Sequence, residues 1–88
     1  MASFVNHILE EKKMFERIKE MLVDELGIDA ADVTPDAKLK GNLGISSVEF
    51  VDIAMTIEEE YNIELNEDKL RKVKTVQELC DYVESLIK

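Results

Sequence analysis

The segment Leu43–Phe50 constrains the fold more than any other part of the chain, because it combines a loop glycine with a helix start. Ser46 and Glu49 have the S-x-x-E spacing of a capping box, in which each side chain accepts a hydrogen bond from the other residue's backbone N–H. Gly44 allows the backbone conformations that a loop-to-helix turn needs. This assignment makes Ser46 the N-cap and Ser47 the first helical residue, with a hydroxyl that the cap does not use.

The helix that begins at Ser47 is expected to continue to Tyr61 and to have two apolar faces. At about 100° per residue, one stripe faces the core; it comprises Phe50, Ile53, Ala54, Ile57 and Tyr61. The second stripe, here called the outer stripe, comprises Val48, Val51 and Met55, and the acidic residues Glu49, Asp52, Glu58 and Glu59 lie around it. A small apolar strip bordered by carboxylates fits the docking of a basic protein surface.

The N-terminal part predicts a first helix within residues 1–26, followed by a long loop. Its apolar residues recur at helical spacing and include Phe15, Ile18, Leu22 and Leu26. Gly27 is a favourable residue for ending this helix. Residues 1–11 form an N-terminal extension that either lengthens the helix or frays. The loop covers residues 28–42, and its apolar residues Ile28, Val33 and Leu39 are spaced as anchors to a helical bundle.

The C-terminal part predicts a short helix over Glu67–Val73 and a last helix that begins after Thr75. Thr75 and Glu78 form a second capping box. The apolar stripe of the last helix comprises Val76, Leu79, Cys80, Val83 and Ile87. No segment alternates as a strand does, so we expect an all-α fold, a small bundle of three longer helices plus one short helix. The basic residues Lys69, Arg71, Lys72 and Lys74 either narrow the choice of partners or form a solvated face.

Composition limits the classes of function. A chain of 88 residues predicts one domain. The net charge of −9 argues against nucleic acid and anionic membrane surfaces as partners, since both are contacted through Lys and Arg. No apolar run reaches the ~20 residues of a membrane span. The single cysteine excludes an internal disulfide and is consistent with a cytoplasmic location.

No catalytic or metal-binding set is found in the sequence. His7 is the only histidine, and it lies in the N-terminal extension. No Ser-His or Cys-His catalytic set can therefore be built. Cys80 lies at core spacing and is expected to be a buried, inert thiol. The acidic residues lack the spacing of a calcium-binding loop. We therefore expect a protein that is not an enzyme and holds no metal ion.

The segment Leu43–Val48, followed by Val51–Tyr61, resembles the acyl carrier proteins, whose signature L-G-x-D-S-L opens an acidic helix that ends in E-E-E-F or a similar run. The resemblance extends from about Phe15 to the C-terminus. It implies that Ser47 carries 4′-phosphopantetheine, donated by coenzyme A, and that the thiol of this arm holds acyl groups as thioesters. The chain departs from the signature at Ser46, where the family has Asp, and at Val48, where it has Leu.

The resemblance implies a free-standing, monomeric carrier (1–88, a single carrier domain) for fatty-acid or specialised acyl biosynthesis. Its partners are then a phosphopantetheinyl transferase and acyl-loading and acyl-transferring enzymes with basic docking surfaces, which contact the outer stripe and its carboxylates. Phe50 is bulky for a position that lines the acyl cavity in relatives, so we expect short or polar cargo. The alternatives are an aminoacyl or polyketide carrier and an unmodified helical interaction module.

Overall fold

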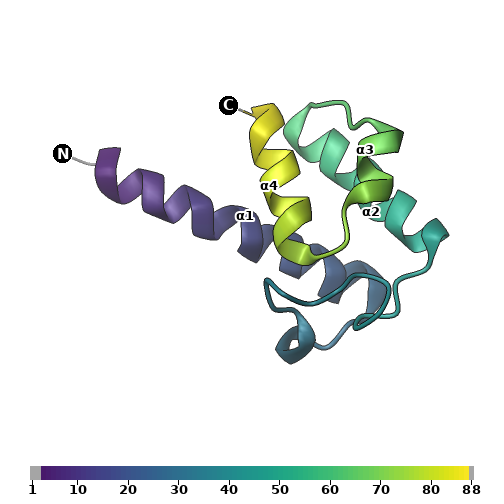
Figure 1. Ribbon diagram of the computed structural model, residues 1–88. Coiled ribbons are helices and arrows are strands. Elements are labelled where there is room, and N and C mark those ends of the chain that lie inside the picture. Colours follow the sequence, from purple (N-terminus) through teal and green to yellow (C-terminus); the bar gives the residue numbers. More distant parts are fainter. Residues whose placement is uncertain (1–2, 88) are drawn as a thin grey trace.

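The computed structural model describes residues 3–87 of the chain, and the side chains of residues 14–87. The described chain forms four α-helices and one turn of 3-10 helix, and no β-strand occurs in it (Figure 1). The helices are α1 (Ser3–Leu26), α2 (Ser47–Tyr61), α3 (Glu67–Lys72) and α4 (Val76–Ile87), and the 3-10 turn is η1 (Ala30–Asp32). The all-α bundle expected from the sequence is confirmed.

The helices end where local sequence allows it. Gly27 has a positive φ of 70° after α1, and Asn62 has a φ of 55° after α2, so both residues occupy the left-handed region in which Gly and Asn are favoured. Asn66 caps α3 by accepting a hydrogen bond from the Lys69 N–H at 3.1 Å. Thr75 accepts a hydrogen bond from the Glu78 N–H at 3.1 Å and thereby caps α4.

The core is formed where α1 packs against α4 and α2. Its fully buried members include Ile18, Met21 and Leu22 of α1, Ile53 and Ile57 of α2, and Val76, Leu79 and Val83 of α4. The loop anchors behave as expected, since Val33 and Leu39 are buried and Ile28 is partly buried against the core. Burial of these apolar side chains is the main favourable contribution to folding.

Three residues on the predicted core stripes are less buried than expected. Phe50 and Tyr61 are only partly buried; they lie near the two ends of α2, whereas Ile53, Ala54 and Ile57 between them are buried. Ile87 is exposed, because the apolar stripe of α4 continues past Val83, its last buried residue. Phe50 therefore remains available at the surface of a cavity described below.

The N-terminal part of α1 extends beyond the bundle (Figure 1). The helix begins at Ser3. The structure does not describe the side chains of residues 1–13. The expectations for this segment, including that His7 belongs to no catalytic set, therefore lie outside the described residues.

Candidate functional site

The start of α2 has the geometry that the capping box predicts. Ser46 Oγ accepts a hydrogen bond from the Glu49 N–H at 3.2 Å, and Glu49 Oε1 accepts one from the Ser46 N–H at 3.0 Å. Ser46 has extended backbone angles, φ −76° and ψ 167°, as an N-cap requires. The hydroxyl of Ser46 and the carboxylate of Glu49 are therefore both occupied by the helix end.

Ser47 differs from Ser46 in having a free hydroxyl. It is the first residue of α2, it is exposed, and its hydroxyl makes no hydrogen bond to any residue whose side chain is described. The N–H groups of Ser47 and Val48 likewise have no partner among the described residues. Backbone N–H groups at the positive end of a helix stabilise an adjacent anion, so a phosphodiester on Ser47 fits this position.

The loop before Ser47 is held in place by backbone hydrogen bonds. Gly44 has a φ of 66°, a conformation that side chains disfavour, and the buried Ile45 donates its N–H to the Leu39 carbonyl at 3.0 Å. Leu39 in turn donates its N–H to the carbonyl of Lys74 at 2.8 Å. The position of Ser47 is thus fixed relative to the segment that joins α3 and α4.

The outer stripe of α2 faces solvent, as the sequence predicts. Val48 is 73% exposed, Val51 53% and Met55 54%, whereas Ile53 and Ile57 on the opposite face are fully buried. Since α2 needs only one apolar face for packing, this second face has no role in the core.

The acidic residues around the outer stripe fall into two groups. Asp52 and Glu59 are exposed and make no ion pair with the described residues. Glu58 was expected to be one of these free charges, but it is partly buried and accepts a hydrogen bond from the Leu65 N–H at 2.8 Å. Glu49 is occupied by the cap. The exposed negative charge of this face therefore comes chiefly from Asp52 and Glu59.

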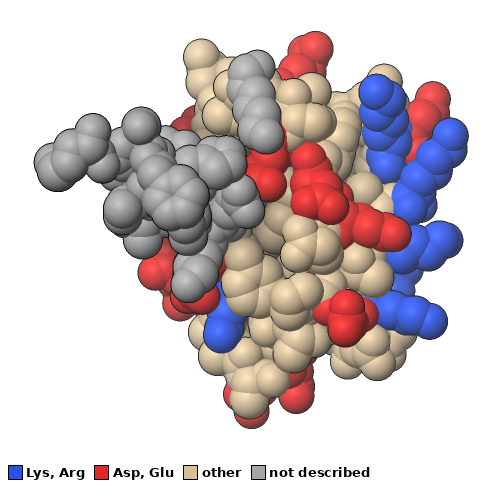
Figure 2. All heavy atoms as spheres, turned by 60° about the vertical axis from the view of Figure 1, so that its left-hand side comes forward, with Lys and Arg blue, Asp and Glu red and all other residues tan. Residues whose placement is uncertain are grey.

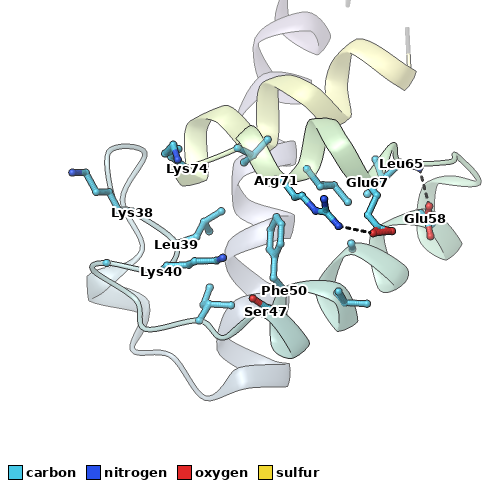
Figure 3. A pocket seen from close by; sticks show the side chains of 16 residues that line it. Lys38, Leu39, Lys40, Ser47, Phe50, Glu58, Leu65, Glu67, Arg71 and Lys74 are labelled. Atoms are coloured by element: carbon cyan, nitrogen blue, oxygen red, sulfur yellow. Dashed lines mark hydrogen bonds and ion pairs between the residues drawn. The ribbon is translucent and has the colours of Figure 1, made fainter.

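A cavity of about 660 Å³ lies between α2, α3 and the loop around residues 38–41 (Figure 3). Its apolar lining residues are Leu39, Ile45, Phe50, Val51, Ala54, Leu65, Leu70 and Val73, and Ser47 lies in its wall. This volume lies within the usual range of ligand pockets. The expectation that Phe50 restricts the cargo stays a prediction, although Phe50 does project into this space.

Sequence reasoning missed the lysines of the loop that border this cavity. Lys38 and Lys40 flank the buried anchor Leu39, and Arg71 of α3 and Lys74, which precedes α4, also line the cavity. Residues 39 and 40 lie in a turn, and no periodic signal in the sequence places their side chains at a cavity. Only Arg71 and Lys74 belonged to the basic patch that the sequence analysis named.

The remaining candidate groups are inert in the structure. Cys80 is buried, and burial raises the pKa of its thiol to about 12. Within the described residues, no three His, Cys, Asp or Glu side chains lie close enough together to hold a metal ion. No described helix combines the length and apolar character of a membrane span.

The helical bundle presents an exposed serine at the start of α2. A family model described as "Phosphopantetheine attachment site" matches residues 16–83. An acyl carrier protein of Solidesulfovibrio magneticus is 38% identical over 69 residues, which cover 78% of this chain and 88% of that protein. The crystal structure of an acyl carrier protein from Thermotoga maritima superposes with a TM-score of 0.81 at 26% identity, covering 92% of this chain and 94% of that one. The chain therefore belongs to the acyl carrier proteins, which carry covalent 4′-phosphopantetheine.

Proposed function

We propose that Ser47 is the residue to which 4′-phosphopantetheine is attached. The observation that carries this assignment is the contrast between two adjacent serines, because the hydroxyl of Ser46 is used by the helix cap while that of Ser47 is exposed and free. When bound, the arm supplies a thiol that holds acyl groups as thioesters. The chain contributes the nucleophilic oxygen, the helix end that stabilises the phosphodiester, and the loop that positions both.

The partners of this carrier are a phosphopantetheinyl transferase and enzymes that load and transfer acyl groups in fatty-acid or specialised acyl biosynthesis. These enzymes dock on the outer stripe and on the carboxylates near it, namely Glu49, Asp52, Glu58 and Glu59. The exposure of the stripe and the net charge of −9 support a basic partner surface. Because the outer stripe begins next to Ser47, a partner bound to the stripe would have its reactive centre close to the arm.

The chain acts as a single, monomeric carrier domain in the cytoplasm and has no catalytic activity of its own. The reaction is performed by the partner enzymes. Because Cys80 is buried, the thiol of the arm is the one that reacts. The location is supported by the single thiol, which needs no oxidising compartment.

Intact-protein mass spectrometry tests the attachment site. The protein is incubated with coenzyme A, Mg²⁺ and a broad-specificity phosphopantetheinyl transferase, beside Ser47→Ala and Ser46→Ala. We expect the wild type and Ser46→Ala to gain one phosphopantetheinyl group and Ser47→Ala to gain none. If Ser47→Ala gains the group, or if only Ser46→Ala fails to gain it, the attachment site is a residue other than Ser47. No gain by any of the three would favour the unmodified interaction module.

A further inference from the structure

Two segments of this acidic chain contain basic residues and no acidic ones. Residues 37–48 include Lys38 and Lys40, and residues 69–74 have the sequence K-L-R-K-V-K. Together the two segments hold six of the eleven basic residues, so only five remain among the twenty acidic residues of the rest of the chain. The opposite charges are therefore segregated along the sequence, although the net charge is −9.

The fold joins the two segments into one surface. Lys38 forms an antiparallel bridge with Thr75, and the Leu39 N–H donates a hydrogen bond to the Lys74 carbonyl at 2.8 Å. Basic side chains gather along one edge of the molecule in Figure 2, apart from most of the carboxylates. This surface is here called the basic edge, and it comprises Lys38, Lys40, Lys69, Arg71, Lys72 and Lys74.

Every cation of the basic edge is exposed, while apolar residues between the cations anchor the backbone. Leu39 is buried, and Leu70 and Val73 are partly buried against the core. The Lys38 N–H also donates a hydrogen bond to Asn42 Oδ1 at 2.7 Å, which closes the loop on itself. The cations are therefore presented to solvent by a backbone whose position is fixed without any ligand.

The basic edge is almost free of ion pairs. Arg71 pairs with Glu67 at 3.2 Å, and no carboxylate of residues 14–87 lies within 4.0 Å of the ammonium groups of the five lysines. Glu78, which follows the edge, accepts hydrogen bonds from the N–H groups of Lys74 and Thr75 at the start of α4. Clustered like charges repel one another and lower stability, so packing of the fold does not account for this cluster.

We propose that the basic edge is a docking surface for an acidic segment of a partner protein. The carboxylates of such a segment would pair with the exposed ammonium groups and with the N–H donors of Arg71 that Glu67 does not use. The outer stripe of α2, with its carboxylates, attracts basic surfaces, which the basic edge repels. The two surfaces therefore select partners of opposite charge.

The borders of the basic edge favour a short acidic segment over a long polyanion. Asp36 precedes the first basic segment, Glu67 and Asp68 precede the second, and all three are exposed. A nucleic acid or an anionic membrane carries negative charge beyond these borders, so the flanking carboxylates and the rest of the acidic surface would repel it. No large apolar side chain of residues 37–42 or 66–75 is exposed, so the edge offers neither a ring for base stacking nor an anchor for lipid.

The test is an NMR titration of the isotope-labelled full chain with hexaglutamate, a short peptide whose side chains are all carboxylates. The protein is used without the arm, so the result does not depend on modification of Ser47. We expect the largest amide shifts within residues 37–42 and 66–75, with a Kd of roughly 1 mM at low ionic strength, as several exposed charge pairs allow. Added salt should weaken the binding, because it screens exposed charges.

The variants Lys38→Gln and Lys74→Gln, one from each segment, should each raise the Kd for hexaglutamate about threefold. Lys19→Gln is the matched control, because it changes the net charge equally at a lysine of α1 whose ammonium group lies over the Phe15 ring. This control should leave the Kd nearly unchanged. The shift map of the wild type provides a second readout that needs no variant.

The absence of shifts, shifts centred on another surface, or equal effects of all three variants would overturn the proposal. Weakening by only one of the two edge variants would show that the segments do not act as one surface, which also overturns it. An oligothymidylate of about 20 nucleotides and phosphatidylserine vesicles, compared with the peptide at equal total charge, should bind more weakly. Tighter binding of either would replace the protein partner by a nucleic acid or a membrane, and edge shifts that grow with protein concentration alone would replace it by a second copy of this chain.

Discussion

At the scale of single residues, the two adjacent serines show how one backbone turn assigns different roles to identical side chains. The N-cap position directs Ser46 Oγ to the Glu49 N–H, whereas one residue later the same group faces solvent. This division follows from local geometry alone, so the sequence was sufficient to predict it. The Asp of the family signature could fill the same cap, because Asp and Ser are similarly good N-caps.

Because only Ser46 caps the helix, removing its hydroxyl should destabilise the protein more than removing that of Ser47. Ser46→Ala removes the cap and should lower the free energy of unfolding by about 1 kcal/mol. Ser47→Ala should change it by less than about 0.5 kcal/mol, since no hydrogen bond of the described residues is lost. Ser46→Asp, the conservative control, should retain the stability of the wild type. Urea denaturation at neutral pH measures all three, and equal losses for both alanine variants would contradict the assignment.

At the scale of helices and loops, the sequence predicted all four α-helices of the described chain, but neither the 3-10 turn η1 nor the cavity between the helices. The boundaries of α2, α3 and α4 follow from caps at Ser46, Asn66 and Thr75, which act over three or four residues. The cavity instead depends on the pairing of residues 37–39 with residues 74–76, which are far apart in sequence. Periodicity is a local signal and cannot show which loop lies against which helix.

A second long-range contact that the sequence did not reveal joins α1 to α2. The guanidinium of Arg17 donates hydrogen bonds from Nε and from a terminal nitrogen to the two carboxylate oxygens of Glu60, and it also pairs with Glu20 at 2.8 Å. The sequence analysis gave Glu60 no specific role. Hydrogen bonding from Arg17 lowers the pKa of Glu60 below its ordinary value of 4.5.

This ion pair predicts a pH-dependent contribution to stability. Because the folded pKa of Glu60 is lowered, its contribution is complete above pH 4.5 and is lost as the pH falls through the lower folded pKa. Glu60→Gln should therefore destabilise the protein by up to about 1 kcal/mol at neutral pH, a modest loss because the pair is partly exposed. The difference from wild type should close in acid. Glu59→Gln, an exposed neighbour without an ion pair among the described residues, is the control, and a gap that persists in acid would contradict the prediction.

Substitution of an exposed residue of the outer stripe should weaken partner recognition without lowering the stability of the fold. Met55 is 54% exposed and does not line the cavity. Met55→Gln should lower the kcat/KM of phosphopantetheinyl transfer by about fivefold, which corresponds to the ~1 kcal/mol lost at a typical contributing interface residue. Leu86→Gln, at an exposed apolar residue of α4, is the matched control and should leave the rate unchanged. Equal effects of both substitutions would exclude the outer stripe as a specific docking surface.

At the scale of the whole molecule, the charge is both large and unevenly distributed. Twenty acidic residues oppose eleven basic ones, and the basic side chains visible in Figure 2 lie mainly along one edge. The rest of the described surface therefore carries more negative charge than the net value suggests. Such an arrangement orients the molecule in the field of a basic partner, with the exposed carboxylates of Asp52 and Glu59 turned towards the approaching positive surface.

The same excess of negative charge should make stability depend on ionic strength. Repulsion among carboxylates disfavours the folded state, and salt screens it over a Debye length of about 10 Å at 0.1 M. If screening raises the free energy of unfolding by about 1 kcal/mol, the melting temperature should rise by about 4–8 °C between low and moderate salt. Mg²⁺ should produce this rise at lower concentrations than Na⁺. The double variant Glu59→Gln/Glu64→Gln removes two exposed charges and should melt higher than wild type at low salt with a weaker salt dependence. A melting temperature that does not change with salt in either protein would show that attraction between the basic edge and the acidic surface balances the repulsion.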